Sequence, residues 1–203
     1  MHIPSNQLVA AVVAISFAAG LNIYATLATL GLLSRFGVFE LPGNLHLLQS
    51  WYIIAISLAL FVIEFFADKI PYFDLIWNAL HTFVRVPIAA LVAYRATATL
   101  SPWEQMLAAA VGGGIALAAH GGKTAARAAV TPSPEPVSNS VLSIGEDVLA
   151  VGLTWFATKH PFLAAATATI LVVIVILLIR WVVRAVRALF RGAEREWSQR
   201  TPA

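Results

Sequence analysis

Long apolar runs alternate with short polar connections along the whole chain. The runs cover about residues 8–33, 47–67 and 74–98, a stretch that begins near residue 104, then 141–157, and a last run from residue 162. A helix of about 20 apolar residues spans the hydrocarbon core of a bilayer. The pattern therefore predicts an all-α integral membrane protein with about six transmembrane helices.

Two parts of this pattern recur, which indicates an internal duplication. At the end of the second run, Phe66, Ala67, Lys69 and Pro71 reappear 90 positions later as Phe156, Ala157, Lys159 and Pro161. The first and fourth runs also align, at an offset of 100 positions. Because each copy holds three spans, the second copy would enter the membrane upside down. This predicts a 3+3 inverted-topology repeat, the plan of many secondary transporters.

The duplication divides a single membrane domain into parts. We expect residues 1–98 to form the first three-helix repeat, residues 99–190 the second, and residues 191–203 a basic cytoplasmic tail. Helix breakers occur at corresponding places, Gly20-Leu21-Asn22 and His120-Gly121-Gly122, and predict broken first and fourth helices. A broken helix presents unpaired backbone N–H groups, which with Lys123 would suit an anionic group.

Composition supports the membrane interpretation. The 203 residues are 60% hydrophobic and 11% charged, whereas soluble domains carry roughly 25% charged residues. A signal peptide is the competing interpretation of the first run, but it needs a basic region before the apolar stretch, and only His2 precedes it. Without any cysteine, disulfides, thiolate metal sites and cysteine nucleophiles are excluded.

Positive charge gathers at the C-terminal end. Six arginines lie there, at positions 180, 184, 187, 191, 195 and 200. A basic segment beside a span is expected on the cytoplasmic side and attracts anionic lipid, here through residues 180–191. This predicts a multi-pass protein of the bacterial inner membrane with both termini in the cytoplasm. Nucleic-acid binding would need basic residues spread over a folded surface, which the rest of the chain lacks.

Polar side chains inside the runs fall at helical spacing. Glu64 and Asp68 share one helical face, as do Asn78, His81 and Arg85 together with Asp74. Lipid penalises each buried charge by roughly 2.5–3.5 kcal/mol, so these faces should look inward and mark a site. The candidate substrate-binding residues are Asn22, Tyr24, Glu64, Asp68, Lys69, Asn78, His81, Arg85, His120, Lys123, Glu146 and Asp147.

Structural roles compete with this site interpretation. Asp68, Lys69, Arg127 and Lys159 lie near predicted helix ends, where ion pairs or interfacial caps would explain them equally well. Asn22 could instead serve close helix packing. Arg85 lies deep in its span and keeps its proton, so it needs a partner. We expect that partner to be Glu146 or Asp147, with Glu64 as the remaining candidate.

Several motifs together resemble a known family. They are Gly20-Leu-Asn-x-Tyr24, Glu64-x-x-Ala-Asp-Lys-x-Pro71, His81-Thr-Phe-x-Arg-x-Pro87, His120-x-x-Lys123 and Glu146-Asp147. The chain resembles, over roughly residues 10–160, a bacterial integral membrane family known as Domain of Unknown Function 4126. The resemblance implies no activity; it implies that these charged positions are the family's signature.

The sequence favours a small transporter-like protein that moves a polar or anionic solute or a lipid headgroup, coupled to protons through Glu64 and Glu146. The alternative is a membrane structural or assembly protein with internal ion pairs and a lipid-binding tail. No nucleophile motif is present, and His81 and His120 lie on different spans without metal-ligand spacing. We therefore expect no enzymatic activity, no metal and no cofactor.

Overall fold

The computed structural model describes residues 4–70, 73–130 and 136–200, without the side chains of residues 43–44, 74–75, 128–130, 136–139 and 189–200. Within these ranges the chain is all-helical and contains no strand. The elements are α1 (Ser5–Leu21), α2 (Ile23–Arg35), the 3-10 helix η1 (Gly43–Gln49), α3 (Trp51–Ala67), α4 (Phe73–Ala96), α5 (Pro102–Val130), α6 (Pro136–Lys159) and α7 (Pro161–Arg200).

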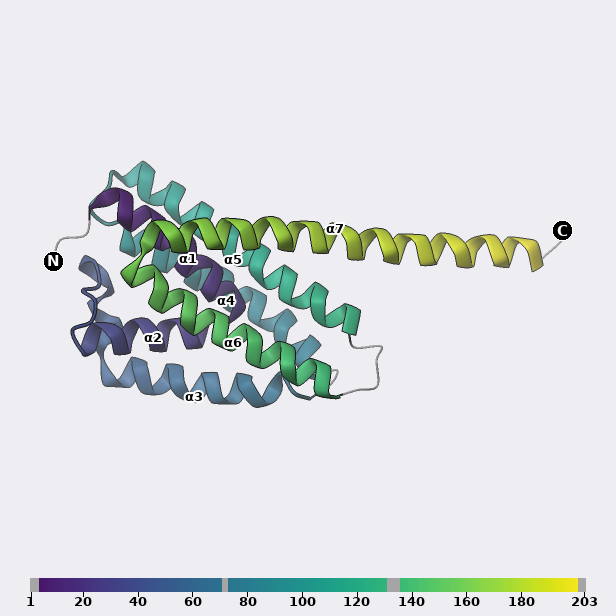
Figure 1. The fold of residues 1–203 in the computed structure, drawn as a ribbon, viewed down its shortest axis with the longest axis horizontal. Helices are drawn as coiled ribbons and strands as arrows, with labels where there is room; N and C mark the ends of the chain where they lie inside the picture. Colours follow the sequence, from purple (N-terminus) through teal and green to yellow (C-terminus); the bar gives the residue numbers. More distant parts are fainter. Residues whose placement is uncertain (1–3, 71–72, 131–135, 201–203) are drawn as a thin grey trace.

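Helix α1 is the centre of the bundle, and α4, α5, α6 and α7 pack around it (Figure 1). From Leu8 to Leu21 only Val9 is exposed and only Val13 is half-buried. A helix that is surrounded by other helices is expected to be apolar on every face, and α1 is apolar all round. Its C-terminal end therefore brings Asn22 to the interior of the protein.

The first predicted span is broken, as expected, and the break lies at Asn22. The chain turns back there, so α2 runs beside α1 in the opposite direction, and residues 8–33 form a hairpin rather than one span (Figure 1). Asn22 has an extended backbone, with φ −149° and ψ 104°, so it ends α1 and begins α2. Its side-chain oxygen accepts a hydrogen bond from the N–H of Ala25, and its own N–H donates to the carbonyl of Ala18. Asparagine is among the best residues for this capping position. Gly20 does not cause the break.

The predicted break in the fourth span is wrong, because α5 continues without interruption through His120-Gly121-Gly122. The glycines serve close packing instead. A Cβ atom on Gly112 would lie 2.7 Å from the Cβ of Ala93, and one on Gly122 would lie 2.5 Å from a methyl of Val175. Glycine costs roughly 1 kcal/mol in a helix interior, which such close helix contacts can offset.

Within the described part of the chain, three helices are long and apolar enough to cross a membrane: Ile76–Ala96, Ser140–Lys159 and Pro161–Ala188. Two more apolar helices, α1 and α3, are shorter. Large apolar side chains such as Tyr52, Phe83 and Ile170 cover much of the outside. Length, composition and exposed apolar surface all support the assignment as a membrane protein.

Helix α7 extends well past the ends of the other helices (Figure 1). It continues as one helix to Arg200, so the predicted tail from residue 191 is a continuation of the last span rather than a separate segment. The side chains of Arg180, Arg184 and Arg187 are exposed. The side chains of the later arginines lie outside the described part of the chain.

Replacement of Gly20 should test the packing of α1. A Cβ atom there would lie 2.4 Å from the carbonyl oxygen of Ala116 and 2.7 Å from the Cβ of Ala119. We expect Gly20→Ala to destabilise the protein by about 1–3 kcal/mol, measured as thermal unfolding in detergent. The matched control is Gly114→Ala, because nothing lies within 4 Å of the Cβ position at Gly114. Equal stability of the two variants would contradict the close approach of α1 and α5.

Candidate functional site

Charged side chains from four helices meet beside the break between α1 and α2. We call them the charge network; among the described side chains it comprises Glu64 and Asp68 of α3, Arg85 of α4, Lys123 and Arg127 of α5, and Glu146 and Asp147 of α6. All are buried except Glu146, whose side chain is 12% exposed. The sequence brings them together because each helix places its charges on one face, and all these faces point inward.

Lys123 is the centre of the charge network. Its ammonium lies 2.7 Å from Asp68 Oδ2, 3.3 Å from Glu146 Oε2 and 3.4 Å from Glu64 Oε1. It also lies 3.4 Å from the carbonyl oxygen of Leu21, the last residue of α1. The helix break exposes this carbonyl, because the chain turns away at Asn22. One lysine thus joins three carboxylates to the broken helix.

Arg127 lies one helical turn beyond Lys123 and binds two of the same carboxylates. Its Nη2 lies 3.1 Å from Asp68 Oδ2 and 2.8 Å from Glu146 Oε2. Its Nη1 donates to the backbone carbonyl of Asp68 at 2.9 Å. Asp68 is the C-terminal capping residue of α3, so this bond satisfies a helix-end carbonyl. Arg127 therefore fixes the end of α3 against α5 and α6.

Arg85 pairs with Glu64, and the expectation of a pair with Glu146 or Asp147 is wrong. Arg85 Nη2 donates to Glu64 Oε1, and both side chains are 0% exposed. The prediction used depth along the helices to choose a partner, but α6 presents its acids to Asn22, Lys123 and Arg127 instead. Because guanidinium keeps its charge at any accessible pH, Glu64 is the carboxylate that neutralises it.

Two histidines adjoin the charge network, and their partners define their tautomers. His120 Nδ1 lies 2.8 Å from Arg85 Nη1 and must accept, since arginine can only donate. Its Nε2 therefore carries the proton and donates to the backbone carbonyl of Asn78 at 2.9 Å. His81 Nδ1 faces the carbonyl of Trp77 at 2.7 Å and carries its proton, which leaves Nε2 to accept from the hydroxyl of Tyr24 at 3.1 Å. The contact with Arg85 assigns His120 as neutral. The Tyr24 hydroxyl can donate or accept, so for His81 the neutral form follows from its burial, which penalises the charged imidazolium.

Asp147 is attached to the helix break directly. Its Oδ1 accepts a hydrogen bond of 2.9 Å from Asn22 Nδ2. Asn22 uses its other side-chain atom, Oδ1, to cap α2. One amide thus links the start of α2 to an acid on α6.

Most of the residues predicted as substrate-binding gather here. One connected set of polar contacts joins Glu64, Asp68, Arg85, His120, Lys123 and Glu146. Two separate hydrogen-bonded pairs, Asn22 with Asp147 and Tyr24 with His81, account for the other predicted residues here. The side chain of Asn78 is buried beside it, but its amide atoms have no hydrogen-bond partner. Lys69 belongs elsewhere: its ammonium donates to the carbonyl of Phe65 and lies 3.0 Å from the centre of that ring.

The prediction omitted Arg127 from the site, since its position near a helix end suggested an interfacial role. The structure buries its side chain completely. Its spacing of four from Lys123 was the available signal. The turn through Pro71 and the side chain of Asp74, which sequence analysis also singled out, lie outside the described part of the chain. Lys159, the repeat counterpart of Lys69, is exposed.

Among the described residues, no group of three or more His, Cys, Asp or Glu side chains is placed to hold a metal ion. The carboxylate oxygens of Glu64, Asp68 and Glu146 form salt bridges with Arg85, Lys123 and Arg127.

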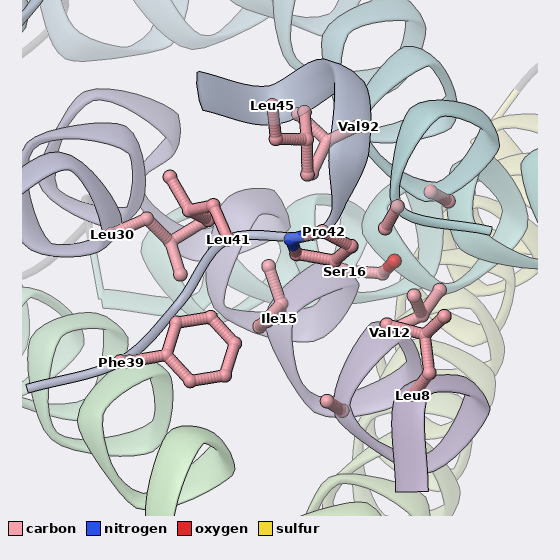
Figure 2. Close-up of a pocket in the computed structure, with 13 residues that line it drawn as sticks. Leu8, Val12, Ile15, Ser16, Leu30, Phe39, Leu41, Pro42, Leu45 and Val92 are labelled. Carbon is pink, nitrogen blue, oxygen red and sulfur yellow. The ribbon is translucent and has the colours of Figure 1, made fainter. Parts of the chain in front are cut away.

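An apolar pocket lies toward the other end of α1 (Figure 2). Leu8, Val12 and Ile15 of α1 line it together with Leu30 of α2 and Val92 of α4. The connection between α2 and η1 covers it with Phe39, Leu41 and Pro42. Ser16 is the one polar side chain among its lining residues. The bundle is thus polar inside at the Asn22 end and apolar inside at the other.

Comparison with known proteins bears on this set of residues. The model of the family described as Domain of unknown function (DUF4126) matches residues 9–181. The chain belongs to this family. The match includes α1 to α6 almost entirely, and with them every member of the charge network. No curated protein and no solved structure matches the chain.

The pair of Arg85 with Glu64 should show strong energetic coupling. We expect Arg85→Met and Glu64→Gln each to cost about 3–5 kcal/mol of stability, because each leaves a buried charge uncompensated. The double variant should cost clearly less than the sum, in a double-mutant cycle on thermal unfolding in detergent. The control cycle combines Arg85→Met with a change at Glu104, an exposed acid whose carboxylate binds Ser101, and should be additive. Additive losses in the first cycle would refute the pair.

Proposed function

We propose that this protein is a small membrane transporter, in which the charge network at the break between α1 and α2 binds a polar or anionic solute and couples its movement to protons. The observation that carries this proposal is the position of Lys123. It lies at the exposed carbonyl end of a broken helix and within ion-pair distance of three carboxylates. Broken helices in the interior of a membrane bundle are where secondary transporters place their sites.

Buried polar atoms without partners support a binding role. Asn78 has neither its amide oxygen nor its nitrogen hydrogen-bonded, and Glu64 Oε2 also lacks a donor. An unsatisfied buried polar group costs about 1–3 kcal/mol, so native proteins keep few of them. A polar solute could hydrogen-bond to these atoms.

Charge balance explains why protons would take part. Every base of the charge network already binds a carboxylate, so a second anion would meet repulsion at Lys123. Protonation of one carboxylate would release a base for the solute. Binding of an anionic group and binding of a proton are then favourable only together, which is the thermodynamic basis of symport.

The inverted repeat forms part of this proposal. Helices α3 and α6, which carry the two copies of the repeated motif, run in opposite directions (Figure 1). Helices α1 and α5, the corresponding first elements, run in the same direction, because Ser16 lies against Gly112 and Gly20 against Ala116. An inverted repeat would reverse them, so its support comes from α3 and α6 alone. The arginines of α7 support a cytoplasmic C-terminal end in a multi-pass protein of the inner membrane. Helix α1 begins at the opposite end of the bundle (Figure 1), so these arginines do not support a cytoplasmic N-terminal end.

A structural or assembly role is the second candidate. Its support is that the charges are paired with one another inside the bundle and that the pocket in Figure 2 is lined almost wholly by apolar side chains. In this role the ion pairs would join α3, α4, α5 and α6, and the exposed arginines of α7 would bind lipids or a partner.

Transport can be tested in liposomes that enclose a pH indicator. Inorganic phosphate, a dicarboxylate and neutral amino acids serve as probes, each applied as an inward gradient. We expect at least one probe to drive proton entry, and Lys123→Gln to abolish that entry because it removes the central base. Lys159→Gln, an exposed lysine at the far end of α6, is the control and should keep the activity. Proton entry that survives Lys123→Gln would contradict this role of Lys123, and no response to any probe would favour the structural role.

Anionic lipid should bind the exposed face of α7. Replacing Arg180, Arg184 and Arg187 together by Gln should weaken attraction to anionic lipid by about 1 kcal/mol per arginine, because each loses its interaction with the negative headgroups. The measurement is lipid retention by purified protein from mixed micelles, at low and high salt. Glutamine replacement of Lys69 and Lys159 is the control. Equal retention by the triple variant would contradict the proposal.

A further inference from the structure

Asp147 differs from every other acid of the charge network. Its side chain is buried, and its Oδ1 accepts from Asn22, but its Oδ2 has no hydrogen-bond partner. Among the described side chains, Glu64, Asp68 and Glu146 each form at least one salt bridge, whereas Asp147 forms none. A buried carboxylate without a base is costly, because removal from water penalises the charged form.

The charge network also contains more acids than bases. Its described members are four carboxylates and three bases, with Glu64, Asp68, Glu146 and Asp147 against Arg85, Lys123 and Arg127. The two adjacent histidines are neutral in their assigned tautomers and do not offset the difference. Lys69 keeps its positive charge, but it lies outside the charge network, and its ammonium contacts the carbonyl and ring of Phe65 rather than a carboxylate. With all carboxylates ionised, these members would carry one uncompensated negative charge.

None of the described groups around Asp147 forms a salt bridge that would compensate its negative charge. Lys123 of α5 attracts the carboxylate but already binds three others, and Lys69, which follows α3, attracts it without forming a salt bridge to it. Glu64 and Asp68 of α3 repel it. Glu146 is its neighbour on α6. From the break between α1 and α2 the contact is the neutral amide of Asn22.

We propose that Asp147 is a proton-binding site that holds its proton at neutral pH. The proton adds to Oδ2 from water and gives a neutral carboxylic acid, while Oδ1 continues to accept from Asn22. The described charge network then has three acids and three bases. Glu64 and Glu146, which the sequence suggested for this role, are less suited because each is held by two bases.

The hydroxyl group of Ser143 is placed to relay the proton to Asp147. Ser143 lies one turn nearer the N-terminal end of α6 and on the same face as Asp147. It is 0% exposed, and its hydroxyl has no hydrogen-bond partner. A hydroxyl can both donate and accept, so it can relay a proton between Asp147 and the end of α6.

The site also connects protonation to the helix break. Loss of the proton would give Asp147 a full negative charge and strengthen its attraction for Lys123, which now holds the end of α1 through Leu21. The same carboxyl group orients Asn22, the cap of α2. A role in coupling rests on the proposed transport function, whereas protonation of Asp147 does not.

Infrared spectroscopy of the full chain in lipid nanodiscs tests this proposal. A protonated carboxyl absorbs apart from a carboxylate, so wild type at neutral pH should show one carboxylic acid band. Labelling the aspartate carboxyl carbons should shift this band, and labelling the glutamates should not. The sequence contains three aspartates, Asp68, Asp74 and Asp147. Asp147→Asn should remove the band and Glu104→Gln should keep it.

Each outcome decides the proposal. Absence of the band, its shift on glutamate labelling, or its survival in folded Asp147→Asn would overturn it. If Asp147→Asn does not fold, Asn22→Ala replaces it: loss of the amide donor to Oδ1 should shift the band, and an unchanged band would count against Asp147. The liposome assay is separate. A carboxylic acid band without proton entry would refute transport but support the proton site at Asp147. Proton entry without the band would support transport but refute the proton site.

Discussion

The structure depends on one constraint: a guanidinium that cannot lose its proton is enclosed in a bundle with an apolar exterior. Arg85 is 0% exposed and requires a carboxylate, which Glu64 of α3 provides. Glu64 also binds Lys123, and Lys123 binds acids of α3 and α6. Satisfying one buried cation therefore brings α3, α4, α5 and α6 to a common point, beside the carbonyl that the break in α1 leaves exposed.

Sequence spacing was a reliable guide to which residues face inward. The pairs Glu64 with Asp68 and Asn78 with Arg85, and the set His120, Lys123 and Arg127, all lie on buried faces. Spacing gave no information on which helix lies opposite, since that depends on tertiary packing. Arg85 was consequently assigned to α6, when the neighbouring acid belongs to α3.

The same distinction applies to the helix breakers. Asn22 ends a helix through its own hydrogen bonds to Ala18 and Ala25, so a local signal predicted the break correctly. The glycines of α5 have no such capping partner. Whether they break the helix depends on what approaches them, here Ala93 and Val175, and that is a property of the fold rather than of the local sequence. The membrane class followed from composition alone.

The length of helix α7 means that a small rotation near its middle produces a larger displacement at its C-terminal end. Its 40 residues form one rod of about 60 Å, and the contact of Gly122 with Val175 lies in its first half. About 37 Å of the rod extends beyond this fulcrum. Gly122 directly precedes Lys123, and a rotation of α7 by about 5° about this contact would displace its far end by about 3 Å. Small adjustments around Lys123 would thereby be magnified along the part of α7 that carries Arg180, Arg184 and Arg187.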